Sequence, residues 1–412
     1  GTLTISAGDT SGTITIASII NDTLDENNET VIVTLSSPGN ASLGADKVHT
    51  YTINDNDATP SLSINDVTAA NENAANKTFT VTLSAASGLA VTVNYATSDG
   101  TATAGADYTA ISATTLTFSP GQTTKTFNVA VLADSLDEAN ETVTLTLSGV
   151  SSTATISDAT GTLTITDDDA TPSLSIADVS GNETAGNRQF TVTLSAAAGR
   201  DVTVNYATSD GTATAGADFT ATSGTLTISA GDTTATFNVG VLADSLDEAN
   251  ETATLTLSSA TNASISDATA TLTITDDDDP PSIDFNATSS NGSESVSSKA
   301  LTVDLSAASG LDVTVNYVVT GTATGSGTDF TLANGTLTIS AGDTSGTITI
   351  ASIVNDSSAE NNETVVVTLS SPGNASLGSD DEHTYTIVDN DDDSVPSLSI
   401  NDVTANNENV AN

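Results

Sequence analysis

The chain has 412 residues, of which 53 are acidic and 6 are basic, so its formal net charge is −47. This charge argues against nucleic acid and anionic membrane surfaces as partners, because both would repel the chain, and it favours cations. The apolar fraction of 37 % follows a strand period, which argues against disorder. The chain has no cysteine, so small extracellular domains of this sequence would need another stabiliser, such as bound metal. No apolar run approaches the ~20 residues of a membrane helix, and we expect no membrane insertion of this segment.

A module of domain size repeats head to tail. Pro60, Pro172, Pro281 and Pro396 each open a short apolar strand, and they recur after 112, 109 and 115 residues. We therefore expect residues 1–57 to be the back part of a module, residues 58–169, 170–279 and 280–393 to be complete modules, and residues 394–412 to be the front of another. A longer period lies on top, since the sequence at 1–19 returns at 335–353, an offset of 334 residues. Three modules thus form a larger unit, and we expect the parent polypeptide to contain many such units.

Within residues 58–169 the alternation of apolar and polar residues predicts seven strands in chain order. Turn sequences such as Ser119-Pro120-Gly121 separate them, and nothing in the pattern indicates a helix. Seven half-buried strands in a domain of this size predict an all-β fold, a seven-stranded antiparallel β-sandwich of immunoglobulin-like architecture. The expected core positions are Leu62, Ile64, Phe79, Val81, Leu83, Val91, Val93, Tyr95, Leu116, Phe118, Phe127, Val129, Val131, Val143, Leu145, Leu147, Leu163 and Ile165.

Strand parity predicts where the acidic residues gather. If successive strands run in opposite directions, the segments after the first, third, fifth and seventh strands lie at one end of the sandwich, which we call the acidic pole. These segments carry Glu72, Asp107, Asp134, Glu138, Glu141, Asp167, Asp168 and Asp169. The opposite pole holds mostly small, uncharged residues, for example at Ala85–Leu89.

Carboxylates crowded at one pole favour a bound cation. A pair of unit charges ~4 Å apart near a protein surface repels by about 4 kcal/mol. Calcium, Ca²⁺, suits such a site because it takes ~6–8 oxygen ligands in flexible geometry, whereas zinc and copper prefer histidine or cysteine. No segment has the calcium loop of an EF-hand. The alternative is an acidic pole that is merely solvated.

The run SDGTATAGADYTAISATTLTFSPGQTTKTFNVAVLADSLDEANETVTLTLS, followed by TGTLTITDDD, resembles the Calx-β domain, which is common in large bacterial surface proteins. The resemblance extends over all the modules. It implies calcium at the tip of each sandwich, with the eight residues above as ligands in the first complete module. In the second it implies Glu183, Asp218, Asp244, Glu248, Glu251, Asp276, Asp277 and Asp278. In the third the cluster is Glu294, Asp329, Asp356, Glu360, Glu363, Asp389 and Asp391, and in the partial module it is Asp22, Glu26, Glu29, Asp55 and Asp57.

The third complete module departs from the pattern at two places. Ala359 stands where Asp137 and Asp247 stand in the other modules. Asn390 interrupts the terminal aspartates, and we expect this interruption to weaken one calcium site.

An odd number of strands lets the chain enter a sandwich at one pole and leave at the other, so the modules can stack into an extended rod. The linkers before Pro172 and Pro281 are short and rigid, and the expected calcium lies beside them. The sequence thus favours a calcium-stiffened segment of a long structural or adhesive fibre on a bacterial cell surface. Its partners would be neighbouring modules and like fibres bridged by cations. A calcium-sensing module of a membrane protein and the stalk of a secreted enzyme are the alternatives. No catalytic residue is expected, since no triad, phosphate loop or acid–base pair is present.

Overall fold

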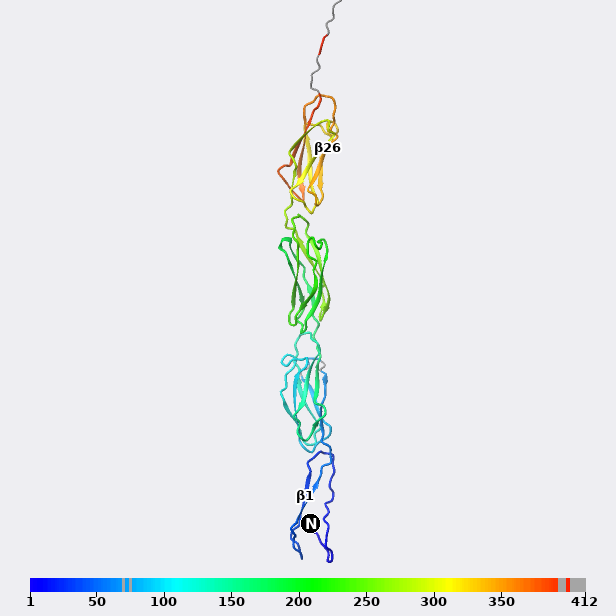
Figure 1. Cartoon of the computed structure of the whole chain (residues 1–412), viewed down its shortest axis with the longest axis vertical. Coiled ribbons are helices and arrows are strands. Elements are labelled where there is room, and N and C mark those ends of the chain that lie inside the picture. The colour runs from blue at the N-terminus through cyan, green and yellow to red at the C-terminus, as the bar shows by residue number, and fades with distance from the viewer. Residues whose placement is uncertain (69–70, 74–75, 392–397, 401–412) are drawn as a thin grey trace, which may run out of the picture.

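The structure is a computed structural model, and it describes residues 1–68, 71–73, 76–391 and 398–400. In Figure 1 the partial module and three complete modules follow one another along the long axis of the molecule. The described residues form β-strands with one short 3₁₀ helix, η1 (Glu183–Ala185), in the second complete module. Residues 58–169 contain no helix in their described part, as expected. No helix in this part of the chain is long and apolar enough to cross a membrane. The predicted front of a further module at 394–412 lies almost wholly outside the described residues.

Each complete module is a sandwich of two sheets, as the sequence predicted. In residues 58–169 the four-stranded sheet has the order β10-β3-β5-β8 and the five-stranded sheet the order β4-β11-β9-β6-β7. The strands are β3 (Ser61–Ile64), β4 (Val67–Thr68), β5 (Asn76–Leu83), β6 (Val91–Asp99), β7 (Thr114–Phe118), β8 (Thr124–Ala130), β9 (Glu141–Ser148), β10 (Thr155–Ile156) and β11 (Thr160–Ile165).

The next two modules repeat this topology, with sheet orders β17-β14-β12-β19 and β13-β20-β18-β15-β16, then β26-β23-β21-β28 and β22-β29-β27-β24-β25. The second complete module comprises β12 (Ser173–Ile176), β13 (Val179–Asn182), β14 (Arg188–Leu194), β15 (Val202–Asp210), β16 (Ser223–Ile228), β17 (Thr234–Val239), β18 (Glu251–Thr261), β19 (Ser264–Ile265) and β20 (Thr269–Thr275). The third comprises β21 (Ser282–Phe285), β22 (Ser289–Ser293), β23 (Ser298–Leu305), β24 (Val313–Gly321), β25 (Gly335–Ile339), β26 (Ser345–Ala351), β27 (Glu363–Gly373), β28 (Ser376–Leu377) and β29 (Glu382–Val388).

The first predicted strand is divided between the two sheets. Its first half, β3, pairs antiparallel with β5, and its second half, β4, pairs parallel with β11. The side chains of Asn65 and Asp66 stabilise the crossing, since each accepts a hydrogen bond from the backbone of a neighbouring strand, from Thr80 N and Thr162 N at 2.7 Å each. A further two-residue strand, β10, pairs parallel with β3. One edge pair of each sheet, β10–β3 or β4–β11, is therefore parallel, and the remaining pairs are antiparallel as expected.

The core lies between the sheets and consists of the predicted alternating positions. All of them are buried except Tyr95 and Leu116, which are partly buried and pack against the same cluster. The Tyr95 ring stacks on Phe127 with centroids 3.9 Å apart. Tyr108 is also fully buried, although it lies in a loop, and its hydroxyl donates to Asp99 Oδ1 at 2.7 Å. This contact joins the loop that carries Asp107 to the end of β6.

The partial module has only the pair β1 (Glu29–Thr34) and β2 (Val48–Ile53). Its apolar side chains are exposed or half-buried: Tyr51 is 39 % exposed, whereas Tyr385, at the corresponding position of β29, is fully buried. The difference arises because the front strands that cover this face in the third complete module have no counterpart here.

Candidate metal centre

The carboxylates of residues 58–169 meet at the acidic pole, because four connecting segments end there. Glu72 lies between β4 and β5, Asp107 between β6 and β7, and Glu138 between β8 and β9, while Asp167 follows β11. Two groups have carboxylate oxygens within 4.8 Å of one another. We call them the inner cluster, which is Glu72, Asp167 and Asp169, and the outer cluster, which is Asp107, Glu138 and Glu141.

Both clusters recur in the second complete module. Its inner cluster is Glu183, Asp276 and Asp278, and its outer cluster is Asp218, Glu248 and Glu251. In the third, Glu294, Asp389 and Asp391 form the inner cluster. Further carboxylates there line one cavity with Glu294 and Asp389, namely Asp329, Asp356, Glu360 and Glu363. In the partial module a pocket is lined by Asp22, Glu26, Glu29, Asp55 and Asp57.

Mutual repulsion and burial disturb the ionisation of these groups. Burial, followed by the charges of Asp134 and Asp169, raises the pKa of Glu72 from its ordinary 4.5 to about 7. Burial and Asp107 raise the pKa of Glu141 to about 7. The corresponding glutamates of the second module, Glu183 and Glu251, have pKa values raised to about 7 by burial and by their neighbouring aspartates. At neutral pH the clusters therefore tend to bind either protons or a cation.

Buried oxygens without partners show what kind of cation the inner clusters fit. In the first two complete modules, one oxygen each of Glu72, Asp169, Glu183 and Asp278 is buried and has no hydrogen-bond partner. The third module repeats this at Glu294 and Asp391. An unpartnered buried carboxylate oxygen is costly unless a cation contacts it. The donors are all carboxylate oxygens, which calcium and magnesium prefer, and the number and crowding of the ligands suit calcium.

A family comparison agrees with this geometry. The model of the Calx-beta domain matches residues 1–57, 55–169, 166–278 and 276–391. The chain belongs to the Calx-beta family. Calx-beta domains are calcium-binding, non-catalytic regulatory or binding modules.

Solved structures of related modules are similar to parts of the chain. The crystal structure of CBD12 from CALX1.2 is 21 % identical and covers 52 % of this chain and 99 % of its own, with a TM-score of 0.27. The crystal structure of the apo-form Calx CBD1 domain is 25 % identical and covers 26 % of this chain and 100 % of its own, with a TM-score of 0.25. TM-scores this low add nothing to the family assignment, which depends on the family model. None of the curated proteins matches the chain.

The asparagine of the recurring Asn-Glu-Thr sequence, for which a structural role beside the ligands was expected, holds the exit segment of every Calx-beta module. Asn140 Oδ1 accepts a hydrogen bond from Asp167 N at 3.1 Å, and Asp167 Oδ1 accepts one from Glu138 N at 3.1 Å. The same asparagine contact recurs at Asn28, Asn250 and Asn362, which accept from Asp55 N, Asp276 N and Asp389 N. The recurring Asn-Glu-Thr sequence was the available signal, since its glutamate is a candidate ligand and its asparagine positions another one.

The middle residue of the terminal aspartate run lies outside the clusters. Asp168 Oδ2 accepts a hydrogen bond from Asn73 Nδ2 at 2.8 Å, and Asp277 Oδ2 accepts one from Asn182 Nδ2 at 2.9 Å. Successive side chains of an extended segment point to opposite sides, so only the first and third aspartates face the glutamate.

Asn390 occupies this same middle position. Its Nδ2 donates to Ser293 Oγ at 3.0 Å, so the interruption removes no carboxylate from the inner cluster of its module. Asn390 therefore removes only a neighbouring charge, and the expected weakening of the site stays a prediction.

Asp134 lies beside the clusters and shapes its own loop. Its Oδ1 accepts a hydrogen bond from Leu136 N at 2.7 Å, and its charge raises the pKa of Glu72 and Glu138. Asp244 and Asp356 make the corresponding turn contacts with Leu246 N at 2.8 Å and Ser358 N at 2.7 Å. These aspartates have one oxygen committed to the turn and a second available to a cation.

Proposed function

We propose that the Calx-beta modules of this chain bind calcium at their inner and outer clusters, and that the bound ion stiffens a long structural or adhesive fibre at a bacterial cell surface. The main support is the set of buried carboxylate oxygens without partners, which recurs at the same two positions in all three complete modules. A bound ion would supply the positive charge that these groups lack.

The outer cluster lies at the contact with the next module. Asp137 precedes the candidate ligand Glu138, and its carbonyl accepts a hydrogen bond at 3.1 Å from Gly199 N of the following module. A ligand bond to Glu138 would restrict the loop that makes this contact. Restricting the loop restricts the orientation of the next module, so loss of the ion would leave repelling carboxylates on a looser joint.

The fibre role is supported by the arrangement of the modules. They follow one another lengthwise (Figure 1), and the acidic loop of each module contacts the opposite pole of the next. The near-identity of the sequence at 1–19 and 335–353 indicates duplication, which lengthens a chain without adding a new site. The charge of −47 would keep neighbouring fibres apart unless divalent cations bridge them.

The proposal is tested on the whole chain by calorimetry and small-angle X-ray scattering with calcium, magnesium or a chelator. A ligand that binds only the folded state at ~100 times its dissociation constant stabilises it by about 2.7 kcal/mol, so calcium should raise the melting temperatures and magnesium should raise them less. Scattering should report a rod in calcium and a broader distance distribution in chelator. Identical melting curves and scattering with calcium and with chelator would contradict the proposal.

A further inference from the structure

The three joints between successive modules share one backbone contact. At each joint the aspartate that directly precedes a candidate-ligand glutamate, Glu26, Glu138 or Glu248, accepts a hydrogen bond through its carbonyl oxygen from a glycine N of the next module. The donor and acceptor are 3.1 Å apart for Gly88 and Asp25, 3.1 Å for Gly199 and Asp137, and 3.0 Å for Gly310 and Asp247.

The glycine lies directly against a glutamate side chain of the preceding module. A Cβ atom at Gly88 would lie 2.6 Å from Glu26 Cγ, and one at Gly310 would lie 2.6 Å from Glu248 Oε1. A Cβ atom at Gly199 would overlap Glu138 in the same way. The glutamates are the candidate calcium ligands, so each ion site lies directly against the next module.

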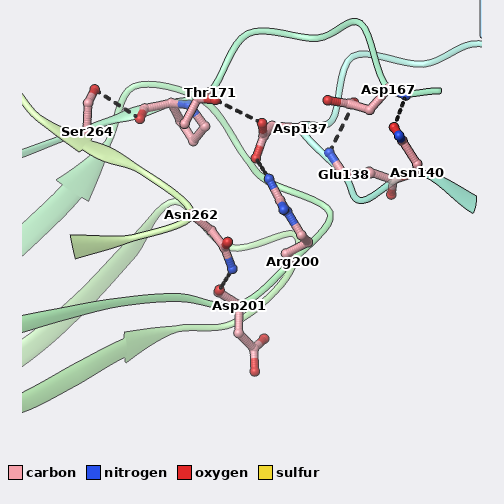
Figure 2. Close-up of polar contacts among 10 residues, drawn as sticks. Asp137, Glu138, Asn140, Asp167, Thr171, Arg200, Asp201, Asn262 and Ser264 are labelled. Atoms are coloured by element: carbon pink, nitrogen blue, oxygen red, sulfur yellow. Dashed lines mark hydrogen bonds and ion pairs between the residues drawn. The ribbon is translucent and has the colours of Figure 1, made fainter. Parts of the chain in front are cut away.

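The side chains differ from joint to joint. Figure 2 shows that Asp137 at the joint between residues 58–169 and 170–279 is contacted from two directions. Arg200 Nη2 of the next module lies 2.5 Å from Asp137 Oδ2, and the hydroxyl of Thr171 in the linker donates to Asp137 Oδ1 at 3.1 Å. This is the one ion pair in the described part of the chain. The Asp137 side chain is only 4 % exposed.

The other joints have no such pair. Leu311 occupies the place of Arg200 at the next joint, where the Asp247 carboxylate accepts only a 3.3 Å hydrogen bond from Ser309 Oγ. Leu89 occupies it at the first joint, where Ser87 Oγ donates to the Asp25 carbonyl oxygen at 3.3 Å. Both leucines are partly buried, so the leucine form of the joint is compatible with the fold.

Arg200 therefore places a positive charge beside the acidic loop of the preceding module. At the other two joints a leucine stands in its place, and a bound cation would have to supply the positive charge. Asp137 belongs to neither carboxylate cluster, so its pairing with Arg200 does not compete with an ion. The pair connects the acidic loop of one module to the next module, and Thr171 adds the linker to the same carboxylate. Breaking this pair leaves the buried Asp137 carboxylate without its countercharge, which opposes bending at the joint, although the Arg200 side chain is itself 34 % exposed.

We propose that the joint between residues 58–169 and 170–279 stays rigid without calcium, whereas the joint between residues 170–279 and 280–391 depends on the ion. Only the statement about the joint between residues 170–279 and 280–391 rests on the proposed calcium stiffening. On chelation the chain would bend at the Leu311 joint, and the two modules on either side of the Arg200 joint would stay rigid relative to each other.

Pairs of spin labels across the two joints test the inference in the whole chain. The chain has no cysteine, so labels attach only at introduced ones. Thr126, Thr236 and Thr347 are exposed on β8, β17 and β26. Labels at Thr126→Cys and Thr236→Cys report the Arg200 joint, and labels at Thr236→Cys and Thr347→Cys report the leucine-type joint. In chelator we expect the second distance distribution to broaden to about twice its width in calcium, and the first to stay unchanged.

Two reciprocal variants serve as controls. Arg200→Leu converts the joint between residues 58–169 and 170–279 to the leucine type. The distance distribution across it should then broaden in chelator as the distribution across the Leu311 joint does. Leu311→Arg should narrow the second distribution in chelator. Equal broadening of both joints in the unmodified chain, or no effect of Arg200→Leu in chelator, would overturn the inference and leave the calcium proposal standing. If chelation broadens the distance distribution across neither joint, the calcium proposal fails. In that case a broader distribution across the Arg200 joint in the Arg200→Leu variant would still support the role of the ion pair.

Discussion

Replacing Glu72 by Gln should change the stability of its module in opposite directions with and without calcium. The substitution keeps the size of the side chain and removes one charge from the inner cluster, where Glu72 is 7 % exposed. Without calcium, the charged form is repelled by Asp134 and Asp169 and is disfavoured by burial. With calcium, the same carboxylate is a candidate ligand, so its loss weakens ion binding.

The pKa of Glu72 sets the size and the pH range of the effect. Its pKa is about 7 in the folded state against an ordinary value of 4.5. The stability due to its protonation is complete below pH 4.5 and is lost as the pH rises through about 7. A shift of this size corresponds to at most roughly 3 kcal/mol. In chelator at ~pH 8, Glu72→Gln should therefore stabilise the module by up to that amount, and at ~pH 4.5 it should change little. Calcium at a concentration of ~100 times its dissociation constant stabilises the folded module by about 2.7 kcal/mol. In calcium the variant should lose part of this stabilisation.

Hydrogen exchange in increasing urea, read by mass spectrometry on peptides from β9 and β18, gives the free energy of unfolding for each module. Glu72→Gln should affect β9, and the matched variant Glu183→Gln should affect β18. Asp158→Asn at the opposite pole is the charge control, since Asp158 is exposed and lies outside the clusters. If Glu72→Gln destabilises β9 equally in calcium and in chelator, Glu72 acts by packing and not through its charge.

Two further predictions concern the terminal aspartates and the joint glycine. Asp169→Asn should lower calcium affinity measured by titration calorimetry far more than Asp168→Asn, because only Asp169 belongs to the inner cluster; equal losses would mean that the cluster is wrongly assigned. Gly310→Ala should shorten the maximum dimension of the chain in X-ray scattering, because the added Cβ would lie 2.6 Å from Glu248. Gly325→Ala is its control, since a Cβ there meets nothing closer than 3.6 Å, and a straight Gly310→Ala chain would refute the proposed role of the glycine.

Much of the fold could be predicted because side chains along a strand alternate between the two faces of the sheet, so burial follows a period of two residues in the sequence. The alternation from Leu62 to Ile165 identified the core, and parity placed the acidic segments at one pole. Tyr108 was missed because it lies in a loop, where no periodicity marks a buried residue. The divided first strand was missed because its two halves differ only in their partners, and a partner in a sheet is a non-local choice.

The sequence by itself determined the sandwich, the pole that carries the negative charge and the all-oxygen donor set, since each follows from residue type and a period of two. Only the tertiary structure decided how the carboxylates divide into inner and outer clusters, and that Asn140 holds the exit segment. It also decided that Arg200 pairs with Asp137, a residue 63 positions away in another module. The physical reason is that these contacts depend on how loops and modules pack against one another, and packing joins residues whose separation along the chain carries no periodic signal.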